Sequence, residues 1–204
     1  MTNQARGRGR PRDEAARQRI LRAALDLMDE APFTQVTAEA IAEKAGASKT
    51  TLYRWWPNKA AVVIEAFREA FAPQLPLRDT GSLRKDLTTQ VRNFARVLSG
   101  RGGRMLRSFI VAARSDPEVA AAFRSIWSDP RREEARSMLR RKQTGGQLSR
   151  DADVDLVLDS LYGPLYYRFL VKNELPSERY AESLAALVIQ GLAPAASPAR
   201  RRHA

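Results

Sequence analysis

The chain of 204 residues carries 35 Lys and Arg against 23 Asp and Glu, a formal net charge of +12 that attracts polyanions such as nucleic acid or an anionic membrane surface. It contains no cysteine, which excludes disulfides and thiolate metal sites, and its one histidine, His203, lies in a basic tail where a Ser-His-Asp arrangement is not expected. No run of about 18 apolar residues offers a membrane span, and no apolar segment follows the basic N-terminus as it does in a signal peptide. We therefore expect a cytoplasmic protein that is not an enzyme and uses no cofactor or metal.

The N-terminal residues predict a basic arm and then a helix. Residues 1–12 include the run Arg-Gly-Arg-Gly-Arg-Pro-Arg and are expected to be disordered. Asp13 is a candidate N-cap, and apolar residues recur at helical spacing from there to Glu30. Pro32 is expected to end this helix.

A capping pattern predicts a short helix that begins after Thr37 and runs to Ala45. The Thr37 hydroxyl can accept a hydrogen bond from an unpaired backbone N–H, and Val36 and Ile41 occupy the positions of a hydrophobic staple. Gly46 can adopt the left-handed conformation that ends a helix.

Two further helices are predicted directly after this one. Ser48 is a candidate N-cap for a helix over Lys49–Trp56, which Pro57 closes. Asn58 can cap the next helix, which starts at Lys59. Three helices joined by very short turns are therefore expected in this part of the chain.

A junction between a head and a body is predicted at 73–81, where two prolines and a glycine fall close together. Helices are then expected at about 83–98 and 104–114. Asp116 followed by Pro117 is typical of a helix start.

The helix that begins there is expected to restart or kink at Pro130 and to continue to about Lys142. Gly145 and Gly146 predict a loop. No segment shows the alternation of a strand.

The last part of the chain predicts two apolar helices. Asp151 is expected to open a long helix to about Lys172 that is interrupted at Gly163-Pro164, and Pro176-Ser177 to start a helix that ends near Leu192. Residues 194–204 are expected to form a disordered tail whose arginines are solvated. The fold class predicted from these elements is all-α.

Two short helices with Gly46 in the turn are typical of a helix-turn-helix, whose second helix enters the major groove of DNA. Leu52 and Trp56, four residues apart, are expected to face inward. The remaining faces carry side chains that can contact phosphates and base edges, and the helix N-terminus at Ser48 and the ammonium of Lys59 can bind phosphate. Those faces hold Lys49, Thr50, Thr51, Tyr53 and Arg54. The alternative is a charged, merely solvated face, as in helical bundles that do not bind DNA.

The segment 36–63, VTAEAIAEKAGASKTTLYRWWPNKAAVV, resembles the DNA-binding head of the tetracycline-repressor (TetR/AcrR) family. The residues that carry the resemblance are Thr37, Ile41, Ala42, Ala45, Gly46, Ser48, Leu52, Tyr53, Pro57, Asn58 and Lys59. It implies an N-terminal three-helix helix-turn-helix domain over 13–58 and a helical-bundle effector-binding and dimerisation domain over 59–193. It also implies a homodimer that binds a palindromic double-stranded DNA operator and a small-molecule effector.

In this family, the matching residues that tend to face DNA are Thr37, Ser48, Lys49, Thr50, Thr51, Tyr53, Arg54, Trp55 and Lys59. The pair Trp55-Trp56 departs from the family pattern, which more often has a small aromatic residue or His followed by Phe. Trp56 is still expected in the core, while the contact that Trp55 makes is left open.

The arm has its own resemblance. Arg8-Gly9-Arg10-Pro11 is similar to the core of an AT-hook, in which arginines enter a narrow minor groove, so Arg8 and Arg10 are candidate DNA contacts. The alternative is an unstructured tail that attracts phosphates without sequence preference.

The body is expected to bind the effector and the second subunit. Since the sequence identifies no buried charge, the effector that the resemblance implies is expected to be mainly hydrophobic. Aromatic residues at helical spacing more often belong to the core, and the candidate pocket residues among them are Phe67, Phe71, Phe94, Phe109, Phe123, Trp127, Tyr162 and Tyr166. The last two helices are more apolar than one inward stripe needs, and their candidate interface residues are Val157, Leu161, Leu165, Leu184, Leu187 and Val188. The alternative is that both faces of these helices are buried within the monomer.

Taken together, the sequence predicts a transcriptional regulator, most simply a repressor that a small hydrophobic effector releases from a palindromic operator. One alternative is an architectural DNA-binding protein without an effector. Another is a helical enzyme or small-molecule carrier whose head is vestigial.

Overall fold

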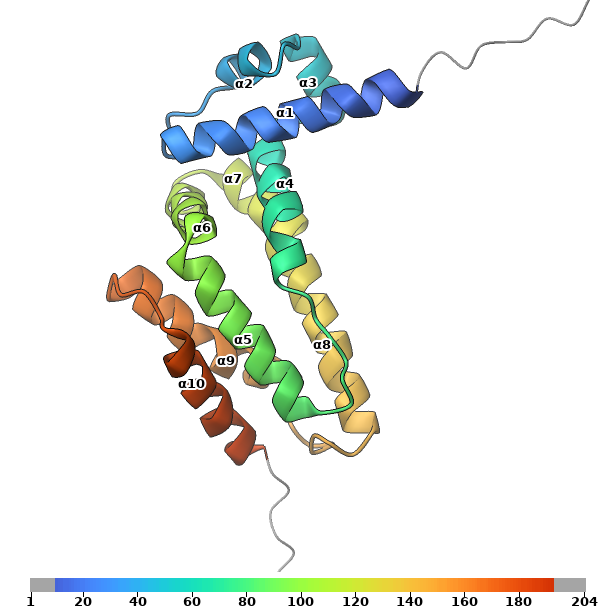
Figure 1. Ribbon diagram of the computed structural model, residues 1–204, viewed down its shortest axis with the longest axis vertical. Helices are drawn as coiled ribbons and strands as arrows, with labels where there is room; N and C mark the ends of the chain where they lie inside the picture. Colours follow the sequence, from blue (N-terminus) through green and yellow to red (C-terminus); the bar gives the residue numbers. More distant parts are fainter. Residues whose placement is uncertain (1–9, 193–204) are drawn as a thin grey trace, which may run out of the picture. The chain divides into compact units, whose positions relative to one another are not determined.

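The computed structural model describes residues 10–192, with side chains from residue 14 onward, and the regular elements in this range are helices (Figure 1). The predicted all-α fold is confirmed, because no strand occurs between residues 10 and 192. None of the helices described there is long and apolar enough to cross a membrane. Two compact units make up the chain, Met1–Gln74 with Gly100–Arg131 and Leu75–Ser99 with Arg132–Ala204.

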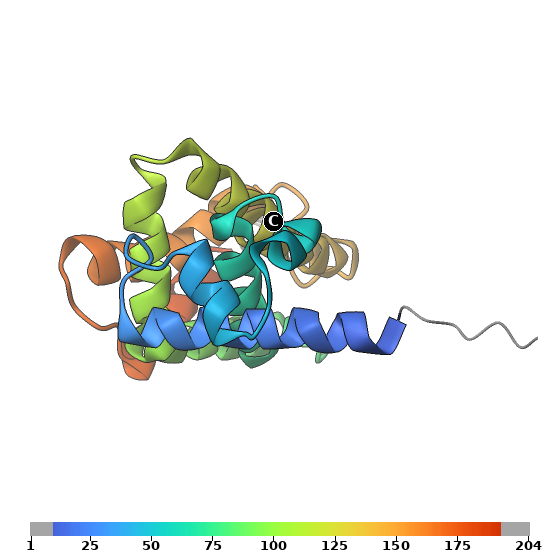
Figure 2. The ribbon, with the colours of Figure 1, turned by 90° about the horizontal axis from the view of Figure 1, so that it is seen from above.

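The first unit contains the N-terminal helices and a later helical segment. Its elements are α1 Arg10–Glu30, α2 Ala38–Lys44, α3 Lys49–Trp55, α4 Lys59–Phe71, the 3-10 turn η1 Ala72–Gln74, α6 Arg101–Ala113, α7 Pro117–Ala122 and the π-helical turn η2 Phe123–Ser128. Helix α1 packs against α2, α3 and α4 (Figures 1 and 2). These contacts hold the three short helices on one long support.

Aromatic rings form the core of the first unit around Phe67, which is fully buried on α4. Its ring lies edge-on to Phe109 of α6 and Trp127 of η2, with centroids 5.4 and 4.8 Å away, and 4.9 Å from Phe71. Phe33 packs on Phe109 at 5.9 Å. Offset and edge-to-face aromatic pairs of this kind add specific geometry to hydrophobic burial, so α4 and α6 have a fixed register.

The second unit contains α5 Leu83–Ser99, most of α8 Asp129–Thr144, α9 Val154–Tyr166, the π-helical turn η3 Tyr167–Val171 and α10 Glu178–Gly191. The backbones of α5 and α10 run side by side (Figure 1), and α9 also packs against α10. Its fully buried side chains include Leu87 and Leu98 of α5 and Leu165 of α9.

A buried ion pair joins α8 to α5. The Lys142 side chain is 3% exposed and that of Asp86 is 1% exposed, and the two groups lie 2.8 Å apart. Lys142 also binds Asp79 at 2.5 Å, while the backbone N–H and the hydroxyl of Thr80 donate to Asp86. Charge-assisted hydrogen bonds therefore fix the segment that precedes α5 to α5 and α8.

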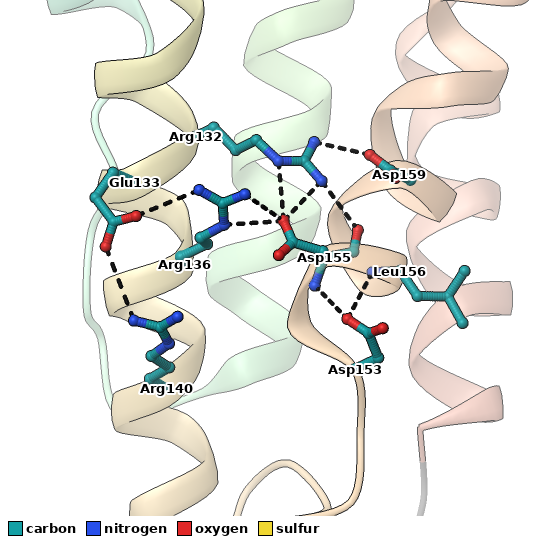
Figure 3. A network of polar contacts seen from close by, with 8 residues as sticks. All are labelled: Arg132, Glu133, Arg136, Arg140, Asp153, Asp155, Leu156 and Asp159. Carbon is teal, nitrogen blue, oxygen red and sulfur yellow. Dashed lines mark hydrogen bonds and ion pairs between the residues drawn. The ribbon is translucent and has the colours of Figure 1, made fainter.

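A second polar network joins α8 to the first turn of α9 (Figure 3). The guanidinium groups of Arg132 and Arg136 lie 2.7 and 2.8 Å from the Asp155 carboxylate, and Arg132 also contacts Asp159. Asp153 caps α9 by accepting hydrogen bonds from the backbone N–H groups of Asp155 and Leu156. Hydrogen bonds from Arg136 and Arg132 hold the pKa of Asp155 below its ordinary value.

Replacing Asp155 with Asn is expected to lower the melting temperature only slightly, because the partners are substantially exposed and such pairs contribute little. The difference should shrink at about 1 M NaCl, where exposed charges are screened. Asp151→Asn, in the turn before α9, is the matched control. An effect of Asp155→Asn that equals the control, or that persists unchanged in high salt, would contradict this role.

Three helices begin at positions that differ from the prediction. Helix α1 already includes Arg10, so Asp13 is not its N-cap, and Pro11 lies in the first turn, where its missing N–H has no helical partner to lose. Helix α6 begins at Arg101 after Gly100, rather than at residue 104. Helix α9 has Asp153 as its N-cap in place of Asp151. The remainder of the arm, residues 1–9, and the tail from 194 onward lie outside the described residues.

The predicted interruption at Gly163-Pro164 is wrong, because α9 continues through both residues to Tyr166. The irregularity comes later, as the π-helical turn η3. The other π-helical turn, η2, ends directly before α8, whose first turn contains Pro130. Proline removes a helical hydrogen bond, and a locally widened helix accommodates this without a break.

Candidate nucleic-acid interface

Helices α2 and α3 form two capped helices joined by a tight turn. The Thr37 hydroxyl accepts a hydrogen bond from the backbone N–H of Ala40 at 3.1 Å, and Ser48 does the same for Thr51 at 3.1 Å. Between the helices, Gly46 has a φ of +59°, a conformation that strains other residues. The predicted caps and turn are confirmed, and they orient α3 independently of its outer side chains.

The inner side of α3 is anchored by Leu52 and Trp56, which are 0% and 3% exposed, as predicted. The Trp56 indole N–H donates to the Glu65 carboxylate of α4 at 2.6 Å. Arg17 of α1 contacts the same carboxylate and also Glu69, at 2.7 Å. The end of α3 is therefore connected by hydrogen bonds to both α1 and α4.

The outer side of α3 brings together the five residues predicted to face outward. They line a single shallow hollow and are Lys49, Thr50, Thr51, Tyr53 and Arg54. Tyr53 is 47% exposed and Trp55 is 37% exposed, although both are large aromatic side chains. Trp55 also packs on Trp56, with ring centroids 6.3 Å apart. This surface combines cations, hydroxyls and exposed rings, which suits contact with phosphates and base edges.

Lys49 has a partner within the same domain. The Lys49 ammonium lies 2.6 Å from the Glu39 carboxylate of α2. This hydrogen bond raises the pKa of Lys49 and lowers the pKa of Glu39, so both groups are charged at neutral pH. To contact a phosphate or a guanine, the Lys49 ammonium must divide its hydrogen bonds between Glu39 and the DNA, or break its hydrogen bond to Glu39.

Lys59 holds the loop that precedes α2. Its half-buried ammonium donates to the backbone carbonyls of Val36 at 2.7 Å and Phe33 at 3.2 Å, and lies 4.3 Å from the centre of the Phe33 ring. Burial lowers the pKa of Lys59. The residue therefore supports the start of α2 in the unbound protein, in addition to any phosphate contact.

The remaining predicted DNA contacts are Arg8, which lies outside the described residues, and Arg10, the first residue of α1. Sequence reasoning did not identify Arg17, Glu65 or Glu69 as supports of α3. The one sequence feature that could have indicated them is the four-residue spacing of Glu65 and Glu69, which puts both on one side of α4.

The predicted effector residues fall in both units. The first unit contains Phe67, Phe71, Phe109, Phe123 and Trp127, and the second contains Phe94, Tyr162 and Tyr166. Within the second unit, Phe94 is edge-on to both tyrosines at 5.3 Å.

The predicted interface residues differ in exposure. Val157, Leu161, Leu165 and Leu184 are buried within the single chain, whereas Leu187 is 68% exposed and Val188 is half-buried. Leu156, Tyr167 and Val171 are further exposed apolar residues of the second unit.

Two capped helices with a basic, hydroxyl-bearing outer surface on the second define a helix-turn-helix DNA-binding domain. Comparison with known proteins gives the family. "Bacterial regulatory proteins, tetR family" matches residues 20–66, and "Tetracyclin repressor-like, C-terminal domain" matches residues 77–188. The chain belongs to the tetR family of helix-turn-helix transcriptional regulators, which indicates a regulator and not an enzyme.

Several relatives match along most of the chain. YdeS, an HTH-type transcriptional regulator of Bacillus subtilis (strain 168), is 38% identical over 185 residues, which cover 91% of this chain and 93% of that protein. The DNA-binding transcriptional repressor TetR of Mycobacteroides abscessus is 27% identical over 167 residues, covering 80% and 87%. The crystal structure of the TetR family transcription regulator SCO0332 is 36% identical, with a TM-score of 0.77 over 88% of this chain and 99% of that one.

Proposed function

We propose that the protein is a homodimeric repressor that binds a palindromic operator and is released from it by a small, mainly hydrophobic effector. The observation that carries this proposal is the outer surface of α3, where Lys49, Tyr53 and Arg54 converge on one hollow of a rigidly capped helix. The related Mycobacteroides protein described as a repressor supports the direction of regulation.

The proposed DNA contacts divide by chemistry. Lys49, Tyr53 and Arg54 are placed to reach base edges and phosphates in the major groove, and Thr50 and Thr51 offer hydroxyls and methyl groups. The other proposed contacts to the DNA backbone or the minor groove are Arg8, Arg10, Thr37, Ser48, Trp55 and Lys59. The dimer would set two copies of α3 about 34–36 Å apart, or a multiple of this distance, to match two half-sites.

The proposed dimer interface uses exposed apolar residues of the second unit. Leu187 and the half-buried Val188 of α10 belong to it, together with Leu156 of α9. A monomer would leave these side chains in water, whereas a twofold contact buries them. The buried leucines of α9 support the interface from within the chain.

Leu187→Glu is expected to convert the dimer to a monomer, because the introduced carboxylate would have to be buried twice across a twofold contact. Sedimentation velocity at micromolar concentration measures the change. Val111→Glu is the matched control, since Val111 is 60% exposed on α6 of the first unit. A Leu187→Glu protein that sediments as the wild type would exclude Leu187 from the interface.

The proposed effector acts by shifting a population. It must bind the conformation that is incompetent for DNA more tightly than the competent one, since equal affinity for both would change nothing. A pocket within the second unit is the proposed site of this binding, with Phe94, Tyr162 and Tyr166 as its aromatic residues.

A reporter assay tests repression. A DNA fragment that the purified protein selects is placed across a promoter, and expression is measured with and without the protein. We expect expression to fall, and the fall to require the palindrome in the fragment. Unchanged expression from a bound promoter would favour an architectural role, and raised expression would favour an activator.

A further inference from the structure

Helix α5 carries a buried amide oxygen that has no hydrogen-bond partner within the described part of the chain. Gln90 is 4% exposed, and its side-chain oxygen accepts no hydrogen bond from any residue that the structure describes. In folded proteins, buried polar groups are almost always hydrogen-bonded, because an unpaired group loses its hydrogen bonds to water and gains none in the protein. An oxygen of this kind in the second unit can accept a hydrogen bond from a bound water or from a ligand.

The neighbours of Gln90 on α5 show where its amide lies. Asp86, one turn earlier, reaches Lys142 of α8, and Phe94, one turn later, packs on Tyr162 and Tyr166 of α9. Residues four apart share one side of a helix. Gln90 therefore lies between these two contacts and faces the interior shared by α5, α8 and α9.

This interior has the chemistry of a small-molecule site. Ligand sites are mostly apolar and aromatic, with a few placed polar groups that fix orientation. Phe94, Tyr162 and Tyr166 supply the rings, and burial raises the pKa of Tyr166, so its phenol stays neutral. The nearby charge of Asp86 is already paired with Lys142. None of these ring and amide groups could compensate the charge of an ionised ligand.

We propose that Gln90 is the polar anchor of the effector site and that its amide oxygen accepts a hydrogen bond from an uncharged, mainly apolar ligand that carries a hydroxyl or ring N–H donor. Phe94, Tyr162 and Tyr166 pack against the apolar part of that ligand. This inference rests on the proposed effector-responsive function and adds the ligand class and the residue that selects it.

A matched pair of probes tests the hydrogen bond. 4-Propylphenol and 4-propylanisole have nearly the same shape, and only the phenol has a donor. By isothermal titration calorimetry on the full-length protein, the wild type should bind the phenol about tenfold more tightly than the ether. In Gln90→Leu this preference should fall to about twofold or less, since no acceptor remains.

The same variant has a second readout without any probe. Removing an unpaired buried amide should raise the melting temperature of Gln90→Leu by several degrees. Gln74→Leu, which changes an exposed glutamine, is the control and should give neither effect. Equal affinity of the wild type for both probes, no binding of the phenol, or a lower melting temperature of Gln90→Leu would overturn the inference.

Operator binding separates this inference from the proposed function. Without probe, the wild type and Gln90→Leu should bind the same selected DNA fragment with equal affinity. If the wild type binds no fragment but prefers the phenol through Gln90, the proposed function fails and the ligand site stands. If both proteins bind the fragment and the phenol preference is absent, only the ligand site fails.

Discussion

Lys142→Met is expected to lower the free energy of unfolding by about 3 kcal/mol, the lower end of the range for a buried ion pair that loses one partner. The variant leaves the Asp86 carboxylate buried without its cation. The lower end applies because Thr80 still donates two hydrogen bonds to Asp86 and because the other partner, Asp79, is half-exposed. Urea unfolding followed by circular dichroism measures the change.

Two further variants separate the ion pair from the loss of a lysine. Lys85→Met, on the exposed side of α5, is the matched control and should change stability little. The double variant Lys142→Met with Asp86→Leu should recover much of the loss, because no uncompensated charge remains buried. A double variant less stable than Lys142→Met would contradict this account of the pair.

The same pair predicts a pH dependence. Burial alone would raise the pKa of Asp86, but hydrogen bonds from Lys142 and Thr80 outweigh it and hold the pKa below its ordinary value. Burial would lower the pKa of Lys142, but Asp79 and Asp86 raise it. The ion pair therefore makes its full contribution to the free energy of unfolding between about pH 4 and pH 10, the unfolded pKa values of Asp and Lys. It is lost as the pH falls below that window through the folded pKa of Asp86, or rises above it through that of Lys142. The difference between wild type and Lys142→Met should accordingly shrink at acid pH.

Lys49→Ala with Tyr53→Ala is expected to weaken operator binding on the order of 100-fold, because each good contact to a base edge or phosphate contributes a factor of about ten. Both residues lie on the exposed surface of α3 and neither supports the core. The melting temperature should therefore stay close to that of the wild type. Fluorescence anisotropy with a labelled operator, at fixed salt, measures the affinity.

Glu39→Gln is expected to act in the opposite direction. It removes the carboxylate that binds Lys49 and that would face the DNA phosphates, so operator affinity should rise. Lys44→Ala is the control for the double variant Lys49→Ala, Tyr53→Ala, because it also removes a cation from this domain; Lys44 lies on α2 and is paired with Glu30. Weakening by Lys44→Ala as large as that of the double variant would show that charge alone, and not the surface of α3, determines binding.

The helix-turn-helix was predictable because its determinants are local. Thr37 and Ser48 each cap the helix that follows within three residues, Gly46 is needed by the turn itself, and the four-residue spacing of Leu52 and Trp56 defines the inner side of α3. Each of these depends on neighbours in the sequence, where caps and periodicity are strong signals.

Other features depend on residues far apart in the chain, which periodicity cannot pair. Nothing local indicates that Glu65 receives the Trp56 indole or that Lys142 is buried against Asp86. Likewise, the apolar surplus of α9 predicted an interface but could not show which side the chain itself covers, and the structure buries Leu161 and Leu165. Nothing local indicates that Gln90, a polar residue of α5, is buried.

Sequence-specific DNA binding through α3 is tested by the selection of genomic DNA fragments with the purified protein at about physiological salt. The selected fragments are then read by sequencing. We expect one enriched palindrome, which is absent when the Lys49→Ala, Tyr53→Ala variant is used. Diffuse enrichment without a motif, or the same palindrome selected by that variant, would contradict sequence-specific binding through α3.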